Sequence, residues 1–360
     1  MATQFHTLKI NKIIRETPDC VSLVFDVPEM LKETFRYREG QNITIKSILE
    51  GQEIRRSYSI CSAPHEEKLK VAVKKVDNGL FSTFANEKLQ EGDQLELMGP
   101  TGRFNAHLSN SESPSYLAIA AGSGITPVIS IIKHCLKTQP DSNFTLVFGN
   151  RNRGSIIFFD ELQALKDKYL GRLNLINILS RERMDTDIHY GRIDKEKLTA
   201  LKDLIPYGSF KAAYLCGPEK MIFEASEFLE KQGLKKDCIH FELFTTPGQT
   251  TSRKIAKGEE TESVKGPMSK VEIKLDGRTF QMELPYHGKS ILDAALEHGA
   301  DLPFACKGGV CSTCRAKLTE GEVEMDVNYA LEADEVEKGF ILTCQGHPRT
   351  GHVKIDFDVK

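Results

Sequence analysis

Four cysteines near the C-terminus have a spacing that can hold iron. Three of them, Cys306, Cys311 and Cys314, lie in one short loop, and Cys344 follows thirty positions later. A C-x4-C-x2-C run with a distant fourth cysteine is typical of a [2Fe-2S] cluster, in which two bridged irons share four thiolates. Two glycines inside the loop let the backbone fold closely over such a cluster. The alternatives are a structural zinc site, whose ligands usually come as two short pairs, or unligated core cysteines.

A second group of residues, in the first third of the chain, could bind a flavin dinucleotide. The two-residue period of an extended strand places Arg56 and Tyr58 on one face. There the Arg56 guanidinium can bind a pyrophosphate, the Tyr58 ring can lie on the isoalloxazine, and the Ser59 hydroxyl can hydrogen-bond near the reactive flavin nitrogen. The alternative is an edge strand with solvated polar residues.

Residues 78–83, about twenty positions after this strand, open a predicted helix. The unpaired backbone amides at its start would make an anion site for the same pyrophosphate. The alternative here is an ordinary capped helix. The candidate cofactor-binding residues of this helix start are Gly79, Leu80, Phe81 and Ser82.

A glycine-containing turn, residues 122–127, connects a predicted strand to a predicted helix. We expect Thr126 to be the N-cap of that helix and Pro127 its first residue. Gly122 and Gly124 would let the phosphates of a dinucleotide approach the helix N-terminus.

Cys216, Gly217 and Pro218 end a later predicted strand, at the sheet edge where open α/β sheets bind ligands. Taken alone, Cys216 would more often be a buried strand residue before a turn. It is therefore both a candidate catalytic residue and a candidate core residue.

Two kinds of sheet are needed to position these residues. Residues 1–110 contain six short alternating segments separated by Pro, Gly or Asp, which predicts an antiparallel β-barrel. Residues 111–244 alternate strands with helices, which predicts a doubly wound parallel sheet. The predicted barrel strands are residues 8–14, 20–27, 41–48, 53–60, 68–76 and 94–98.

The remaining residues divide into a tether and a third domain. Residues 245–268 are rich in Thr, Lys, Glu, Gly and Ser and have almost no large apolar residue, so we expect a flexible linker. In residues 269–360, Asp276-Gly277 lies between two alternating segments and predicts a hairpin. Ser290 is a predicted helix N-cap, and Gly299 and Pro303 are expected to end that helix.

Composition narrows the class of protein. The chain has 360 residues with 40% hydrophobic content, enough for two or three cores, and its net charge of -3 includes an acidic excess in residues 270–360. The sequence shows neither a signal peptide nor a membrane span, and no basic run with aromatics that would indicate nucleic-acid binding. Five further cysteines stand in isolated apolar contexts, which favours a reducing cytoplasm.

The C-terminal region resembles the plant-type ferredoxins in its cysteine loop, hairpin and helix, which implies a β-grasp fold. The flavin and nucleotide motifs resemble the ferredoxin-NADP reductase family. In this chain Pro127 stands where the usual dinucleotide fingerprint has its third glycine. The same replacement is found in that family, so the resemblance favours a nicotinamide nucleotide. That resemblance implies that Val73 and Lys74 brace the flavin by backbone contacts and that Cys216 lies beside the nicotinamide. It also implies that Ser180 and Arg181 meet an adenosine 2′-phosphate, which favours NADPH over NADH, and Arg151 is a second candidate for the same phosphates. The resemblance further implies that Phe244 packs near the flavin, although packing in the core would also explain this residue.

The predicted cofactors imply an order of transfer. A nicotinamide gives two electrons as hydride, a [2Fe-2S] cluster takes one at a time, and FAD between them would convert one into the other. The sequence contains no Glu-x-x-His, the motif of di-iron carboxylate proteins, so oxygen chemistry is expected elsewhere.

Reductase domains followed by a ferredoxin module resemble the reductase subunits of phenylacetyl-CoA epoxidases and of ketosteroid hydroxylases. The expected function is an NADPH-dependent oxidoreductase that serves a separate oxygenase, with phenylacetyl-CoA epoxidase first. The alternatives are a reductase of a Rieske-type or other hydroxylase, and a non-catalytic iron-sulfur redox sensor.

Overall fold

The computed structural model describes residues 4–105, 112–184, 186–244 and 267–359. These residues form two compact units, one containing the two sheets that precede residue 245 and one containing the sheets that follow it. The tether predicted for residues 245–268 lies outside the described residues except for its last two positions, so it stays a prediction. In the described part of the chain, no helix is both long enough and apolar enough to span a bilayer.

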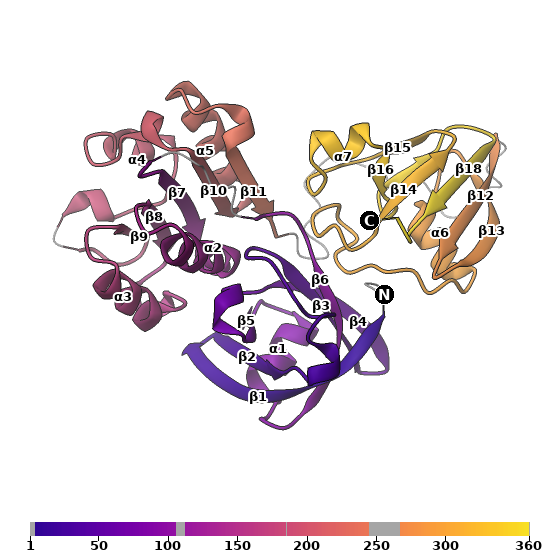
Figure 1. Cartoon of the computed structure of the whole chain (residues 1–360), viewed down its shortest axis with the longest axis horizontal. Coiled ribbons are helices and arrows are strands. Elements are labelled where there is room, and N and C mark those ends of the chain that lie inside the picture. The colour runs from indigo at the N-terminus through magenta and orange to yellow at the C-terminus, as the bar shows by residue number, and fades with distance from the viewer. Residues whose placement is uncertain (1–3, 106–111, 185, 245–266, 360) are drawn as a thin grey trace. The chain divides into compact units, whose positions relative to one another are not determined.

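The first sheet is the predicted antiparallel barrel, in the strand order β4-β3-β6-β1-β2-β5 (Figure 1). Its inward side chains form one core that includes Ile10, Leu23 and Ile45, all nearly or completely buried. The helix α1 (Leu80–Glu87) packs against β5 and places Phe81 in this core. The six strands are β1 (Phe5–Thr17), β2 (Cys20–Asp26), β3 (Asn42–Leu49), β4 (Gln52–Ser59), β5 (Leu69–Lys74) and β6 (Gln94–Thr101).

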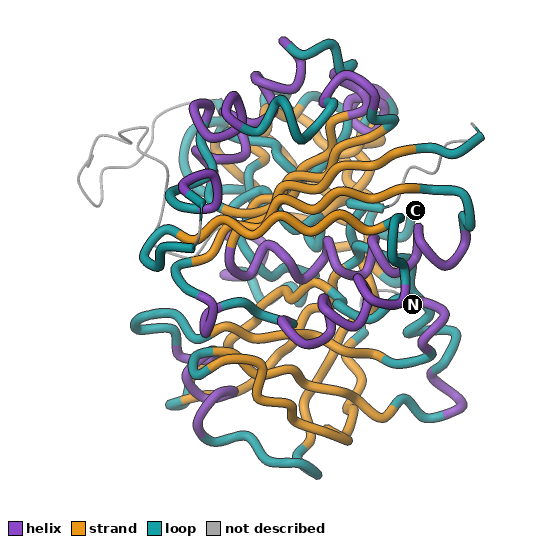
Figure 2. Tube along the Cα trace, turned by 90° about the vertical axis from the view of Figure 1, so that its left-hand side faces the viewer, coloured by secondary structure: helices purple, strands orange, loops and turns teal. Residues whose placement is uncertain are grey.

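The second sheet is parallel, in the order β11-β10-β7-β8-β9, with helices on both faces (Figure 2). The described residues 112–184 and 186–244 therefore fold as the doubly wound sheet that the alternation predicted. The strands are β7 (Ser115–Ala121), β8 (Asn143–Asn150), β9 (Leu173–Leu179), β10 (Ala212–Gly217) and β11 (Ile239–Leu243). The helices are α2 (Ile125–Thr138), α3 (Phe159–Lys168), α4 (Lys195–Ala200) and α5 (Glu219–Lys231).

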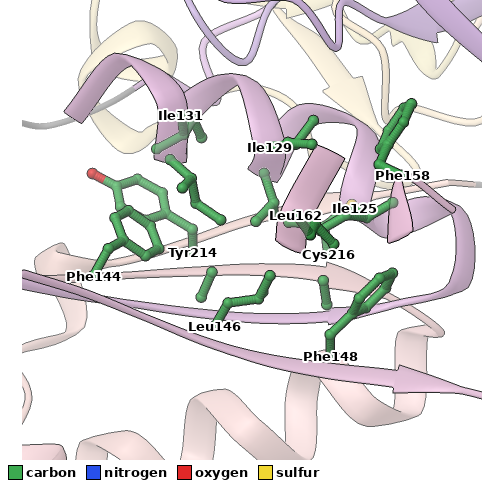
Figure 3. Close-up of a cluster of buried hydrophobic side chains, with 14 of the residues drawn as sticks. Ile125, Ile129, Ile131, Phe144, Leu146, Phe148, Phe158, Leu162, Tyr214 and Cys216 are labelled. Carbon is green, nitrogen blue, oxygen red and sulfur yellow. The ribbon is translucent and has the colours of Figure 1, made fainter. Parts of the chain in front are cut away.

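The helix α2 covers the middle of this parallel sheet. Ile125, Ile129 and Ile131 of α2 belong to one buried cluster with Phe144 and Leu146 of β8 and Tyr214 of β10 (Figure 3). The rings of Phe144 and Tyr214 are stacked, with centroids 6.4 Å apart. This apolar packing fixes the start of α2 at the carboxyl edge of the sheet, where nucleotides bind in open α/β folds.

The last unit has the β-grasp arrangement, a mixed five-stranded sheet in the order β13-β12-β18-β14-β16 with one helix, α6, against it. Asp276 and Gly277 have φ of 50° and 73°, so the predicted hairpin turn is confirmed. Ser290 caps α6 by accepting a hydrogen bond of 3.2 Å from the amide of Asp293, as predicted. The strands are β12 (Met268–Leu275), β13 (Arg278–Pro285), β14 (Arg315–Glu320), β15 (Val323–Met325), β16 (Phe340–Leu342), β17 (Gly346–Pro348) and β18 (His352–Asp356), and the helices are α6 (Ile291–Glu297) and α7 (Ala333–Glu337).

Candidate functional site

The four cysteines of the iron motif come together in two pairs. Cys306 lies beside Cys311, and this neighbouring thiol lowers the pKa of Cys311. Cys314 lies beside Cys344 and lowers the pKa of Cys344 in the same way. Among the described residues, no three His, Cys, Asp or Glu side chains are arranged as ligands of a single metal ion. A [2Fe-2S] cluster instead requires two thiolates for each of its two irons, and the two cysteine pairs can supply them. The residues present therefore fit the cluster.

The loop around these cysteines is shaped by its backbone and by Gln345. Gly309 has φ of 74°, and an added Cβ would lie 3.1 Å from the carbonyl oxygen of Val327, so the position requires glycine. The amide of Gly308 donates to the sulfur of Cys306 over 3.3 Å. The side-chain amide of Gln345 donates to the carbonyl of Lys307 over 2.9 Å and lies 3.7 Å from the sulfur of Cys344. Gln345 was not predicted, and its position directly after Cys344 is the sequence signal that could have indicated it.

The candidate flavin-binding residues of β4 lie as the strand period predicted. Arg56 and Tyr58 are half-buried on one face, and Arg56 donates to the backbone carbonyl of Arg55 over 2.7 Å. The rings of Tyr58 and Phe81 have centroids 5.6 Å apart. This contact brings the strand and the helix start into one place, although they are separated by twenty residues.

The helix α1 begins at Leu80, so its first-turn amides are at the predicted position. Ser82 shapes the turn before it, since its hydroxyl accepts from the amide of Val76 over 3.2 Å and donates to the carbonyl of Gly79 over 3.1 Å. A Cβ on Gly79 would lie 2.4 Å from that hydroxyl. Only glycine fits there without moving Ser82.

Val73 and Lys74 end the strand β5 next to this turn. Val73 is buried, and its carbonyl accepts from the side-chain amide of Asn86 over 3.0 Å. The Lys74 ammonium lies 3.7 Å from the carboxylate of Asp19 and 3.9 Å from where a Cβ on Gly122 would be. The end of β5 therefore adjoins the nucleotide loop.

The nucleotide loop differs from its prediction in one respect. Residues Gly122–Gly124 form a 3-10 turn that leads directly into α2, so the N-cap is Gly124, and the expectations for Thr126 and Pro127 were wrong. Because the chain is already helical before Thr126, the Thr126 hydroxyl donates to the carbonyl of Ser123 over 3.0 Å instead of capping. A Cβ on Gly124 would lie 2.1 Å from the carbonyl oxygen of Cys216, so glycine permits this close approach.

Cys216 is fully buried on β10, among the side chains beneath α2 (Figure 3). Burial, together with the nearby charge of Glu242, raises the pKa of its thiol well above the ordinary value, so the thiol stays neutral. Glu242 is the β11 partner of Cys216 in the sheet, and its carboxylate accepts from the Ser59 hydroxyl over 3.1 Å. Three strands thus bring Ser59, Glu242 and Cys216 together, and sequence reasoning did not predict the role of Glu242.

Three further candidate residues lie at the ends of β10 and β11. Gly217 is the last residue of β10, and Pro218 is the N-cap of α5. Phe244 directly follows β11 and is 41% exposed, so it is not a core residue.

The candidate 2′-phosphate residues lie side by side beyond the carboxyl ends of β8 and β9. The amide of Arg181 donates to the carbonyl of Arg151 over 2.8 Å, and both side chains are exposed. The amide of Ser180 likewise donates a hydrogen bond to a backbone carbonyl at the end of β8. The carboxylate of Glu182 accepts from the amide of Arg153 over 2.7 Å, so the acidic residue among these arginines is directed at the backbone.

Three family models match consecutive parts of the chain. They describe an oxidoreductase FAD-binding domain at residues 7–106, an oxidoreductase NAD-binding domain at residues 118–227 and a 2Fe-2S iron-sulfur cluster binding domain at residues 273–349. These matches confirm the predictions of FAD, a pyridine nucleotide and a [2Fe-2S] cluster.

Relatives with the same domain order match nearly the whole chain. It is 44% identical to one subunit of the 1,2-phenylacetyl-CoA epoxidase of Escherichia coli K12, over 99% of both chains. It is 33% identical to the ferredoxin reductase component of 3-ketosteroid-9-alpha-monooxygenase of Rhodococcus rhodochrous, over 97% of this chain and 96% of the relative. The structure of phthalate dioxygenase reductase, described as modular for electron transfer from pyridine nucleotides to [2Fe-2S], has the same fold, with a TM-score of 0.57 and 22% identity over 98% of both chains. The chain therefore belongs to the family of electron-transfer reductases that combine an FAD-binding, a pyridine-nucleotide-binding and a [2Fe-2S] domain.

Proposed function

We propose that this reductase takes hydride from NADPH and delivers single electrons to the oxygenase component of a phenylacetyl-CoA epoxidase. The observation that carries the proposal is the 44% identity to a subunit of such an epoxidase, over 99% of both chains. The ketosteroid monooxygenase relative favours a second candidate, a reductase for another hydroxylase.

The flavin would be held between β4, the end of β5 and the start of α1. Arg56 and the first-turn amides of α1 supply positive charge and donors for a pyrophosphate, and Tyr58 offers a ring face. Val73 and Lys74 would contribute backbone contacts to the flavin ring. When bound, FAD supplies the conversion of a two-electron hydride into single electrons.

The region where hydride transfer would occur is formed by Ser59, Glu242 and Cys216. The Ser59 hydroxyl donates its proton to the Glu242 carboxylate, so its oxygen would be the atom that accepts a hydrogen bond from an N–H of the flavin. Cys216 remains a neutral thiol, so it would pack against the nicotinamide without attacking it. Phe244 is exposed beside β11 and would cover the flavin.

The preference for NADPH would come from Arg151 and Arg181. Their backbones are hydrogen-bonded to each other, so two exposed guanidinium groups start from adjacent positions beyond the sheet edge. Two arginines suit a dianionic 2′-phosphate, because each guanidinium can make two charge-assisted hydrogen bonds. Ser180 would add a hydroxyl.

The cluster would be held by Cys306, Cys311, Cys314 and Cys344, and its domain would be joined to the flavoprotein part by the tether of residues 245–268. Such a tether keeps the two parts at high effective concentration and still permits contact with a partner protein. We place this chemistry in the cytoplasm, where cysteines outside the cluster stay reduced.

Reconstitution tests the proposal. The purified protein, loaded with iron, sulfide and FAD, is combined with the oxygenase subunits of a phenylacetyl-CoA epoxidase, NADPH and phenylacetyl-CoA, and epoxide formation is measured. A parallel reaction contains the oxygenase of a ketosteroid hydroxylase and its steroid. Epoxide formation coupled to NADPH consumption is expected, and product only in the steroid reaction would favour the second candidate.

The same preparation separates a reductase from a redox sensor. Stopped-flow mixing with NADPH and with NADH follows the flavin and cluster absorption bands separately. In a reductase the flavin band bleaches before the cluster band. We expect this bleaching to be faster with NADPH than with NADH. A protein with a cluster but no flavin band would support the sensor.

A further inference from the structure

Two nearly buried lysines and two partly exposed glutamates meet within the first compact unit, and we call these four side chains the four-charge cluster. Lys133 is 5% exposed, and its ammonium lies 3.1 Å from the Glu66 carboxylate and in contact with the Glu161 carboxylate. Lys70 is 12% exposed, and its ammonium lies 2.9 Å from the second oxygen of Glu161. Each of the two nearly buried ammonium groups therefore lies against a carboxylate of opposite charge, as a buried ion requires.

The four-charge cluster joins the barrel to the parallel sheet. Lys70 lies on β5 and Glu66 ends the short 3-10 helix Pro64–Glu66, so both belong to the barrel. Lys133 lies on α2 and Glu161 on α3, so both belong to the nucleotide-binding domain. Each lysine therefore pairs with a glutamate of the other domain.

Neutral hydrogen bonds reinforce the same junction. The Ser130 hydroxyl donates to the carbonyl of Ser62 over 2.6 Å, and the Lys133 ammonium donates to the carbonyl of Cys61 over 3.3 Å. Ser130 and Lys133 are three residues apart and so lie on one face of α2. This face of α2 contacts the barrel through charged and neutral donors.

Both lysines keep Glu161 ionised. Burial by itself raises the pKa of this carboxyl, but Lys133 and Lys70 outweigh burial and hold the pKa below its ordinary value. Removing either lysine leaves a partly buried carboxylate with one partner fewer.

The elements that carry the four-charge cluster also carry the two candidate cofactor sites. The helix α2 begins directly after the glycine turn Gly122–Gly124. Ser62 follows Ser59 by three residues, and Lys70 precedes Lys74 on β5 by four residues. Any shift of α2 on the barrel would change the distance between these flavin-binding segments and the nucleotide loop.

We propose that the four-charge cluster fixes the register of the two domains, and that Lys133 is a positioning residue for hydride transfer. The proposal rests on the route from nicotinamide to flavin given above. A buried ion pair contributes little net stability compared with well-packed apolar side chains, but its geometry is directional. Directional contacts suit a junction at which a shift of about 1 Å costs about 100-fold in rate.

The test uses the full-length holoenzyme with Lys133→Met, which keeps much of the side-chain volume and removes the charge. Lys137→Met is the control, because Lys137 is an exposed lysine on the same helix. Stopped-flow measures the rate constant of flavin reduction at saturating NADPH, and titration measures the Kd of NADP⁺. For Lys133→Met we expect a rate constant about 10- to 100-fold lower. Its Kd should be nearly unchanged, and 4-deuterated NADPH should give a full isotope effect.

Glu161→Gln provides a milder second variant, since it keeps the shape and removes the charge that both lysines contact. The proposal would be overturned if the variants at both positions fold, contain FAD, and have their flavin reduced by NADPH at the wild-type rate. So would a weaker Kd with an unchanged rate constant, because that result means binding and not positioning. Failure of both variants to fold would also overturn it, since the four-charge cluster would then serve folding alone. A wild-type protein that neither NADPH nor NADH reduces would instead refute the proposed route.

Discussion

Replacing Gly124 with alanine perturbs the contact between the nucleotide loop and the end of β10. The added Cβ would lie 2.1 Å from the carbonyl oxygen of Cys216 and 2.9 Å from the amide nitrogen of Gly217. Both are backbone atoms of a central strand, so neither can rotate away as a flexible side chain would. The oxygen would have to retreat by about 1.3 Å to reach an ordinary contact of 3.4 Å.

This displacement sets the expected magnitude. A misplacement of about 1 Å at reacting groups costs about 100-fold, so flavin reduction at saturating NADPH should be about 100-fold slower in Gly124→Ala. Overpacking costs about 1–3 kcal/mol of stability, which should lower the Tm of the first unit without preventing folding. FAD content and the cluster spectrum should be unchanged, because their candidate residues lie on other segments.

Stopped-flow at the flavin band, with NADPH in excess, measures the effect. Gly351→Ala is the matched control, since Gly351 has an ordinary φ and no atom within 4 Å of its added Cβ. A correctly folded Gly124→Ala protein that is reduced at the wild-type rate would show that this close approach does not position the nicotinamide.

Three further predictions concern the other candidate residues. Cys311→Ser should abolish reduction of one-electron protein acceptors and keep NADPH-dependent ferricyanide reduction, and loss of both activities in a folded variant would contradict separate flavin and cluster sites. Arg181→Ala should raise the KM for NADPH about 10- to 100-fold, because a charge-assisted hydrogen bond contributes about 1.5–3 kcal/mol. The KM for NADH should be unchanged, and equal effects on both nucleotides would argue against a contact with the 2′-phosphate. Ser59→Ala removes the hydrogen bond to Glu242 and should slow flavin reduction about tenfold while FAD content stays constant, so an unaltered rate constant would remove Ser59 from the proposed site.

Local sequence determined the elements that depend on near neighbours. Asp276-Gly277 predicted the hairpin turn because two consecutive positive φ angles favour these residues, and the turn is present. Ser290 predicted a helix start because a hydroxyl can accept from the helix's third amide, and it does so. The same reasoning misplaced the start of α2 at Thr126, because a 3-10 turn before a helix leaves no distinct local signal.

The cysteine spacing and the R-x-Y-S and G-x-G-x-x-P runs were enough to indicate three cofactors, because each run is a short continuous segment whose residue types and spacing are typical of one cofactor. Contacts between segments needed the tertiary structure. Ser59 and Glu242 are 183 residues apart, and Lys70 and Glu161 are 91 residues apart. Such pairs form only when the barrel and the parallel sheet pack together, and a hydroxyl or a lysine carries no local sign of its distant partner. The sequence thus determined which cofactors this protein can hold, and only the packing of the two domains decided which side chains meet between the flavin and nucleotide sites.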